Sequence, residues 1–121
     1  MSGYELYLQL PGLPKTTNGA HGHWRAAASQ KKKWRTATKE AAILSGAPEN
    51  PLSEARIELV RHSSSQPDYD NLVISFKPVI DGLRDAGVIS DDKIANIGVP
   101  KYSWKKASPK NGHITISVSS L

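Results

Sequence analysis

The stretch Pro67–Lys93 reads PDYDNLVISFKPVIDGLRDAGVISDDK and contains all six aspartates of the 121-residue chain. Of the 16 Lys and Arg residues in the chain, only Lys77 and Arg84 lie between Asp68 and Asp92. Neighbouring carboxylates repel one another and stay ionised when positive charge lies among them, so this cluster indicates a divalent cation. Oxygen ligands favour Mg²⁺ or Mn²⁺. A basic chain around such a site suits a polyphosphate substrate such as nucleic acid.

The composition sets limits on the class of protein. A length of 121 residues predicts one domain that spans residues 1–121. The net charge of +5 mildly favours nucleic acid as a partner. The absence of cysteine excludes disulfides and thiolate metal sites. No apolar run approaches the ~18 residues of a membrane helix, and the N-terminus lacks the apolar core of a signal peptide, so we expect a soluble cytoplasmic protein without membrane association.

The first half of the chain predicts two strands and a long helix. Alternating apolar residues at Tyr4–Leu10 predict a half-buried strand. The segment Trp24–Ser45 contains no proline or glycine and predicts a helix. Its expected apolar stripe consists of Trp34, Ala37, Ala41 and Leu44. The segment Ser53–His62 predicts a second strand whose Ile57 and Leu59 point inward.

The second half predicts a further helical region and two more strands. The pattern from Asn71 is helical, and Pro78 predicts either a kink or a short helix followed by another that begins near Pro78. Gly87 fits the residue that follows a helix end. Strands are expected at 94–104 and 113–118, joined by an exposed hairpin loop at 105–112. These elements predict an α+β fold in which two main helices pack on one face of a mixed sheet of about four strands.

Each aspartate also has an ordinary structural explanation. Asp68 or Asp70 could cap the helix that follows. Surface charges explain Asp81 and Asp85, which are four apart on a helix, and a turn explains the pair at positions 91 and 92. None of these explanations accounts for the separation of aspartates from lysines along the chain.

The functional interpretation assigns a metal site to Asp68, Asp70 and one of Asp91 or Asp92. Carboxylates two positions apart in an extended segment point the same way and can share an ion. In phosphodiester hydrolysis, bound metal ions activate water and neutralise charge on the transition state. Lys77 is the only lysine within the cluster, and it would share a helix face with Asp70 if the helix were unbroken. Its ammonium would add electrostatic stabilisation.

A set of short motifs occurs in a fixed order along the chain. They are PDYDNL at 67–72, FKP at 76–78, DGL at 81–83, AGV at 86–88 and DDKI at 91–94. The set resembles the RusA family of Holliday junction resolvases, whose pattern is D-x-D-N-L, a lysine, D-x-L, a small-residue turn and D-D. The leading strand that ends in a proline-rich turn, with Asn18 downstream, is similar too. In the best-known pattern the lysine follows the second aspartate by four residues, where this chain has Ile74, so matching Lys77 requires about three extra residues.

The resemblance implies a homodimeric, Mg²⁺-dependent endodeoxyribonuclease that nicks opposed strands of four-way DNA junctions in recombination and repair. It implies Asp68, Asp70, Asp92 and Lys77 as catalytic residues, and Asp68, Asp70, Asp91 and Asp92 as candidate metal ligands. For DNA contacts we predict Asn18, Arg25, Lys31, Lys32, Lys33 and Arg35. A solvated helix face is an equally good explanation of the helical lysines. Two alternative functions are a metal nuclease for flaps or other branched DNA, and a protein that binds branched DNA without cutting it.

Overall fold

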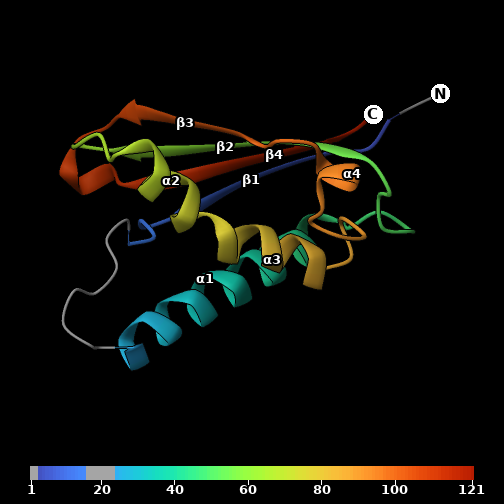
Figure 1. Cartoon of the computed structure of the whole chain (residues 1–121), viewed down its shortest axis with the longest axis horizontal. Helices are drawn as coiled ribbons and strands as arrows, with labels where there is room; N and C mark the ends of the chain where they lie inside the picture. Colours follow the sequence, from blue (N-terminus) through green and yellow to red (C-terminus); the bar gives the residue numbers. More distant parts are fainter. Residues whose placement is uncertain (1–2, 16–23) are drawn as a thin grey trace.

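The fold is a mixed four-stranded sheet with its helices on one face (Figure 1). The computed structural model describes residues 3–15 and 24–121, with side chains described from residue 27 onward in the first helix. The strands are β1 (Glu5–Pro11), β2 (Ala55–Ser63), β3 (Lys101–Lys106) and β4 (His113–Ser120). The helices are α1 (Trp24–Ser45), α2 (Tyr69–Ser75), α3 (Lys77–Asp85) and the short α4 (Ile94–Ile97), with a 3₁₀ turn η1 (Pro109–Asn111). This arrangement confirms the predicted α+β fold.

The order of strands in the sheet is β1-β4-β2-β3. Strand β4 is antiparallel to both β1 and β2, whereas β3 is parallel to β2. The hairpin expected between the last two strands is therefore wrong, because β2 lies between them. Parallel neighbours need a crossover, and the helices that follow β2 supply it, so β3 becomes the edge strand beside β2.

Strand β1 shows the alternation that its sequence predicts. Leu6, Leu8 and Leu10 are buried on the helical side, whereas the residues between them are exposed. On β2, Ile57 and Leu59 point into the same core. One face of the sheet is therefore apolar and covered, as expected where the strands alternate between buried and exposed residues.

Helix α1 packs against α3 and β1, but its buried face differs from the expected stripe. The fully covered positions are Trp34, Thr38 and Ala42, whereas Leu44 is 88% exposed. One helical turn takes 3.6 residues, so residues four apart lie on nearly the same face of the helix. The buried residues of α1 follow this spacing, and Leu44, two residues after Ala42, points away from their face. The Thr38 hydroxyl donates to the Trp34 carbonyl at 2.8 Å, which satisfies its polar group inside the core.

A break at Phe76 separates two helices, the second of which begins beside Pro78, and this confirms one of the two predicted outcomes. Helix α2 ends at Ser75 and α3 begins at Lys77, so the proline lies in the first turn of α3, where its missing N–H is not needed. Gly87 follows the end of α3 with φ +79°, and its N–H donates to the Arg84 carbonyl at 3.0 Å. A glycine at this position closes the helix as the sequence predicts.

The segment expected as a strand at 94–104 begins instead with one helical turn, α4. The Lys93 carbonyl accepts the N–H groups of Asn96 and Ile97 at 2.8 and 3.0 Å, and Gly98 at φ +60° ends the turn. The strand starts only at Lys101.

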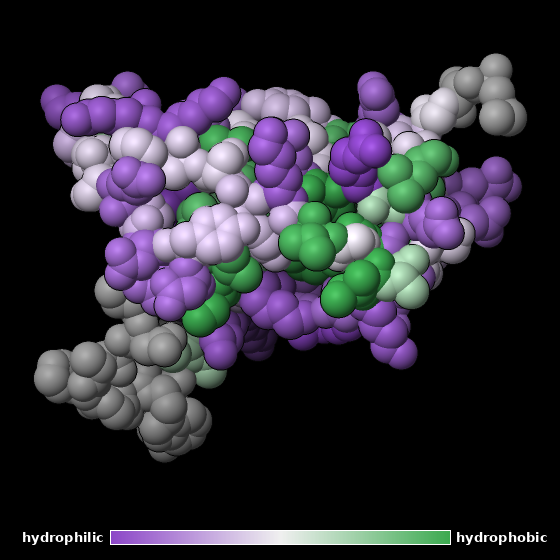
Figure 2. Space-filling model, turned by 45° about the horizontal axis from the view of Figure 1, so that its top comes forward, coloured by the Kyte–Doolittle hydropathy of each residue, from purple (hydrophilic) through white to green (hydrophobic). Residues whose placement is uncertain are grey.

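Figure 2 shows hydrophobic surface as patches among hydrophilic side chains. No helix in the described ranges is both long and apolar enough to span a bilayer.

Candidate active site

The first two motif aspartates lie where the chain enters α2. Asp68 is extended, with ψ 147°, and its side chain makes no capping hydrogen bond. Asp70 already lies in the first helical turn and accepts the N–H of Asn71 at 3.1 Å. The expected extended arrangement of Asp68 and Asp70 is therefore wrong, because the helix starts at Tyr69. Both carboxylates are exposed to solvent.

Aromatic contacts fix the start of α2 against the edge of the sheet. The rings of Tyr69 and Tyr102 meet edge to face, with centroids 6.4 Å apart. Phe76, fully buried after α2, lies 6.1 Å from the Tyr102 ring. Such aromatic pairs add stability beyond the area that they bury, so β3 holds the helix that carries Asp70.

A second group of charges surrounds Lys77 at the start of α3. The Lys77 ammonium donates to Asp81 Oδ1 at 2.8 Å and also to the carboxylate of Asp92. Arg84 approaches the same two carboxylates, at 3.7 Å from Asp81 and 3.4 Å from Asp92. We call Lys77, Asp81, Arg84, Asp91 and Asp92 the Lys77 cluster. Asp91 belongs to the cluster because its Oδ1 lies 3.9 Å from Nη1 of Arg84.

The contacts within the Lys77 cluster stabilise the charged forms of its members. Hydrogen bonds to Asp81 and Asp92 raise the pKa of Lys77 above its ordinary value. The hydrogen bond from Lys77 lowers the pKa of Asp92, against an opposing effect of burial. Lys77 is therefore a protonated donor at neutral pH. It can stabilise negative charge, but it cannot accept a proton as a general base.

The helix break at Phe76 changes the expected partners of Lys77. Because α2 and α3 are separate helices, Lys77 does not share a continuous helix face with Asp70. The structure instead brings Lys77 to Asp81 and Asp92. Within residues 3–15 and 24–121, no three His, Asp or Glu side chains are grouped closely enough to enclose a metal ion. The assignment of the metal ligands stays a prediction.

Asp81 and Arg84 are not among the site residues that the sequence predicts. The sequence offers Asp81 as a surface charge and as part of the DGL motif, and Arg84 only as a positive charge within the stretch. The signal was present in the spacing, since Lys77 and Asp81 are four apart and Asp81 and Arg84 are three apart on one helix. Both spacings bring side chains together on a helix surface.

The residues predicted to contact DNA differ in their surroundings. Lys31, Lys32 and Lys33 are exposed on α1, as a phosphate-binding surface requires. Arg35 instead forms a bidentate pair with Asp85 of α3, with Nε–Oδ2 at 2.5 Å and Nη2–Oδ1 at 2.9 Å. This pair lowers the pKa of Asp85 and joins the two helices. Asn18 and the side chain of Arg25 lie outside the described residues.

Comparison with known proteins adds no assignment to this geometry. No protein-family model matches the chain, and no curated protein matches its sequence.

Proposed function

We propose that this protein is a Mg²⁺-dependent endodeoxyribonuclease that nicks four-way DNA junctions as a homodimer. The observation that carries the proposal is the hydrogen bond between Lys77 and Asp92, which are 15 residues apart. This hydrogen bond joins Lys77 of the FKP motif to Asp92 of the DDKI motif. Both motifs belong to the set that resembles the RusA family. A basic chain of net charge +5 suits a DNA substrate.

The donor chemistry of the site fits a hard cation. All the candidate ligands, Asp68, Asp70, Asp91 and Asp92, offer carboxylate oxygens, the donors that Mg²⁺ and Mn²⁺ prefer. Mg²⁺ commonly takes only one or two protein carboxylates and completes its shell with water and substrate phosphate. A closed group of three side chains is therefore not required. When bound, the ion would supply a more acidic water and neutralise charge on the phosphate.

The chain's own contribution centres on Lys77. Its side chain is 57% exposed, so the ammonium is accessible to a phosphate although it touches two carboxylates. Asp81 and Asp92 hold the ammonium in place and keep it protonated. In the proposed reaction Lys77 donates to a phosphate oxygen as negative charge develops there. Arg84, near the same carboxylates, offsets the charge of Asp92 when Lys77 binds substrate.

Asp70→Asn tests the assignment of the carboxylates. We expect the variant to lose cleavage of a four-way junction and to keep most of its junction affinity, because affinity depends on lysine and arginine contacts to phosphates. The matched control is Glu49→Gln, which removes an exposed carboxylate from the loop between α1 and β2, outside the proposed site. Cleavage by Asp70→Asn near the wild-type rate would show that the metal site is assigned to the wrong carboxylates.

A further inference from the structure

The sheet face that the helices leave uncovered carries a row of three ionisable side chains on three adjacent strands. His62 of β2 is the register partner of His113 on β4 and of Lys105 on β3. These residues alternate with buried positions such as Ile114, so their side chains lie on the face opposite the core. We call His113, His62 and Lys105 the basic row.

The two imidazoles of the basic row form an ordered pair. Their rings are stacked, with centroids 4.1 Å apart and planes 8° from parallel. Nδ1 of His113 donates to the Asn111 carbonyl at 2.7 Å, and Nε2 of His62 lies 3.3 Å from the Thr115 hydroxyl. Since a carbonyl only accepts, His113 carries its proton on Nδ1, and its Nε2 makes no hydrogen bond within the part of the chain described here.

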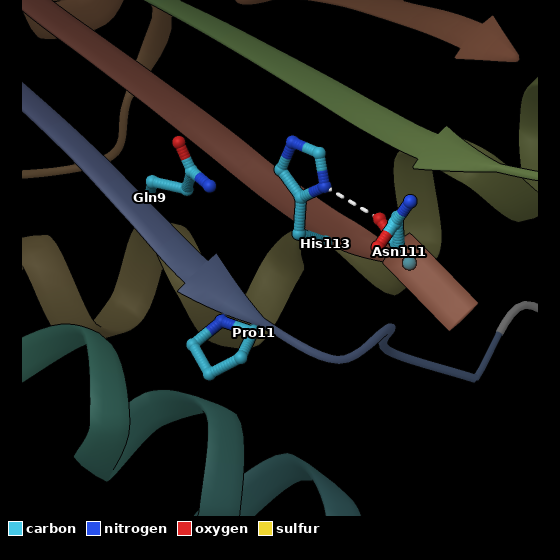
Figure 3. A pocket seen from close by; sticks show the side chains of 5 residues that line it. Gln9, Pro11, Asn111 and His113 are labelled. Carbon is cyan, nitrogen blue, oxygen red and sulfur yellow. Dashed lines mark hydrogen bonds between the residues drawn. The ribbon is translucent and has the colours of Figure 1, made fainter. Parts of the chain in front are cut away.

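An open pocket gives access to the outer side of this pair. Gln9, Pro11, Asn111 and Gly112 line it together with His113. Figure 3 shows the His113 ring standing between the side chains of Gln9 and Asn111. A ligand that reaches the pocket can therefore approach the ring edge of His113 from solvent.

The charges around the basic row are of one sign. No aspartate or glutamate follows Asp92 in the sequence, whereas five lysines do, namely Lys93, Lys101, Lys105, Lys106 and Lys110. On β2, the carboxylate nearest to His62 on this face is that of Glu58, four residues earlier, and it pairs with the Lys101 ammonium at 3.9 Å. The groups that face His62 are His113 from β4 and Lys105 from β3, while β1 contributes uncharged Gln9 and Pro11 and η1 contributes Lys110.

We propose that the basic row binds the phosphate backbone of a nucleic-acid strand, as a contact surface separate from the aspartates. The proposal rests on the proposed function for the nature of the polymer. Phosphate supplies negative charge, which the row itself does not contain. Lys105 can donate to the phosphate oxygens, and the two histidines can do so once their rings are protonated. Self-association through this face would instead bring like charges together, which costs free energy.

The position of the basic row relates it to the candidate active site. His62 lies near the end of β2, and the loop after Ser63 leads to Asp68 at the start of α2 (Figure 1). The row and the first aspartates thus lie at the same end of the molecule, on the two sides of the sheet. A strand bound along the row would cross the sheet toward the β3 edge, where Tyr69, next to Asp68, packs against Tyr102.

Salt dependence of binding tests the lysine of the row. The affinity for a fluorescent four-way junction is measured in chelator, so that nothing is cut, over a range of salt concentrations. Lys105→Gln should reduce the slope of log affinity against log salt by about 0.9, the effect of one lost phosphate contact. Lys101→Gln is the matched control, because Lys101 lies on the same strand and face but pairs with Glu58. It should leave the slope unchanged.

The pH dependence of binding tests the histidines. Burial, His113 and Lys105 lower the pKa of His62 in the free protein. A bound phosphate favours the charged ring, so binding takes up a proton and wild-type affinity should rise as the pH falls from about 8 to about 5.5. In the double variant His62→Gln with His113→Gln, much of this rise should be lost. His21 and His23 are unchanged in both proteins, so the difference isolates the stacked pair.

The outcomes separate this proposal from the proposed function. If the wild type binds the junction, but Lys105→Gln and the histidine variant match Lys101→Gln in slope and pH dependence, the basic row does not bind nucleic acid and the proposed function stands. If the wild type binds no junction even at low salt, both proposals are wrong. If Lys105→Gln alters the sedimentation of the free protein and leaves the salt slope intact, the face is a protein interface, which overturns the proposal. Circular dichroism confirms that each variant is folded.

Discussion

At the scale of single residues, the proposed chemistry depends on the protonation state of Lys77. Its ammonium touches Asp81 and Asp92, and these contacts raise its pKa. A protonated lysine beside candidate metal ligands is suited to stabilise charge on a phosphate, not to remove a proton from water. An exposed surface lysine without a role would show no dependence of catalysis on its charge or shape.

Lys77→Ala should lower the single-turnover rate of junction cleavage by about 10²–10³ under saturating Mg²⁺, with little change in binding. Lys77→Arg keeps the charge but not the compact ammonium, so it should recover only part of the rate. Lys39→Ala, an exposed lysine of α1, serves as the control and should cut normally. A wild-type rate for Lys77→Ala would end this assignment and direct attention to Lys93, which lies 3.8 Å from Asp91.

The sequence singles out Lys77, whose catalytic role stays a prediction, but it does not show the contact between Lys77 and Asp92. Lys77 was singled out because it lies among aspartates, and that clustering needs no structure. The Asp92 contact depends on the chain's return after Gly87, a tertiary feature that periodicity cannot show. The contact with Asp81 followed from helical spacing and was available from the sequence.

At the scale of elements, the close packing of α1 on α3 depends on Gly82. A Cβ built at Gly82 would lie 2.5 Å from the carbonyl oxygen of Arg35 and 2.8 Å from the Thr38 Cβ. The Arg35–Asp85 pair links the same two helices. Because α3 also carries Lys77 and Asp81, this packing helps to position the candidate site.

Gly82→Ala should therefore destabilise the protein by about 1–3 kcal/mol, the usual cost of overpacking against backbone that cannot move. Urea unfolding followed by circular dichroism measures the loss. Ile74→Ala on α2, where the side chain is 54% exposed, is the control and should change stability little. A Gly82→Ala protein as stable as the wild type would mean that α1 does not approach α3 as closely as described.

Helix α1 also carries the predicted phosphate-binding surface of Lys31, Lys32 and Lys33. If this surface lies on DNA, replacing all three with alanine should weaken junction binding and reduce the salt slope by about 0.9 for each lost contact. Replacing all three with arginine keeps the charge and should preserve the slope. A normal slope in the folded alanine variant would identify these lysines as an ordinary solvated helix face.

Elements with strong local signals were predicted, and elements set by distant contacts were not. The bounds of α1 agree with the expected Trp24–Ser45, because uninterrupted helix-forming sequence and Gly46 define them locally. The turn of α4 was mistaken for a strand, since its apolar residues fit either structure over so short a segment. The exposure of Leu44 depends on where α3 crosses α1, which no pattern within α1 contains.

At the scale of the whole molecule, the strand order determines which surfaces remain free. The crossover after β2 places β3 at the edge, and β4 returns between β1 and β2. The sequence predicted a mixed sheet with helices on one face but could not supply this order, because each strand signal is local whereas pairing is not. The order brings His113, His62 and Lys105 into one row, and it leaves the aspartates on the helical side.

Nicking of a synthetic four-way junction by the wild-type protein is the decisive experiment for the proposed function. A linear duplex of the same sequence and a flap substrate are run in parallel, each with Mg²⁺, Ca²⁺ or chelator. We expect paired nicks in opposed strands of the junction with Mg²⁺, little cleavage of linear duplex, and no cleavage with Ca²⁺ or chelator. Binding without cleavage under Mg²⁺ or Mn²⁺, or equal cutting of junction and linear duplex, would contradict the proposed function.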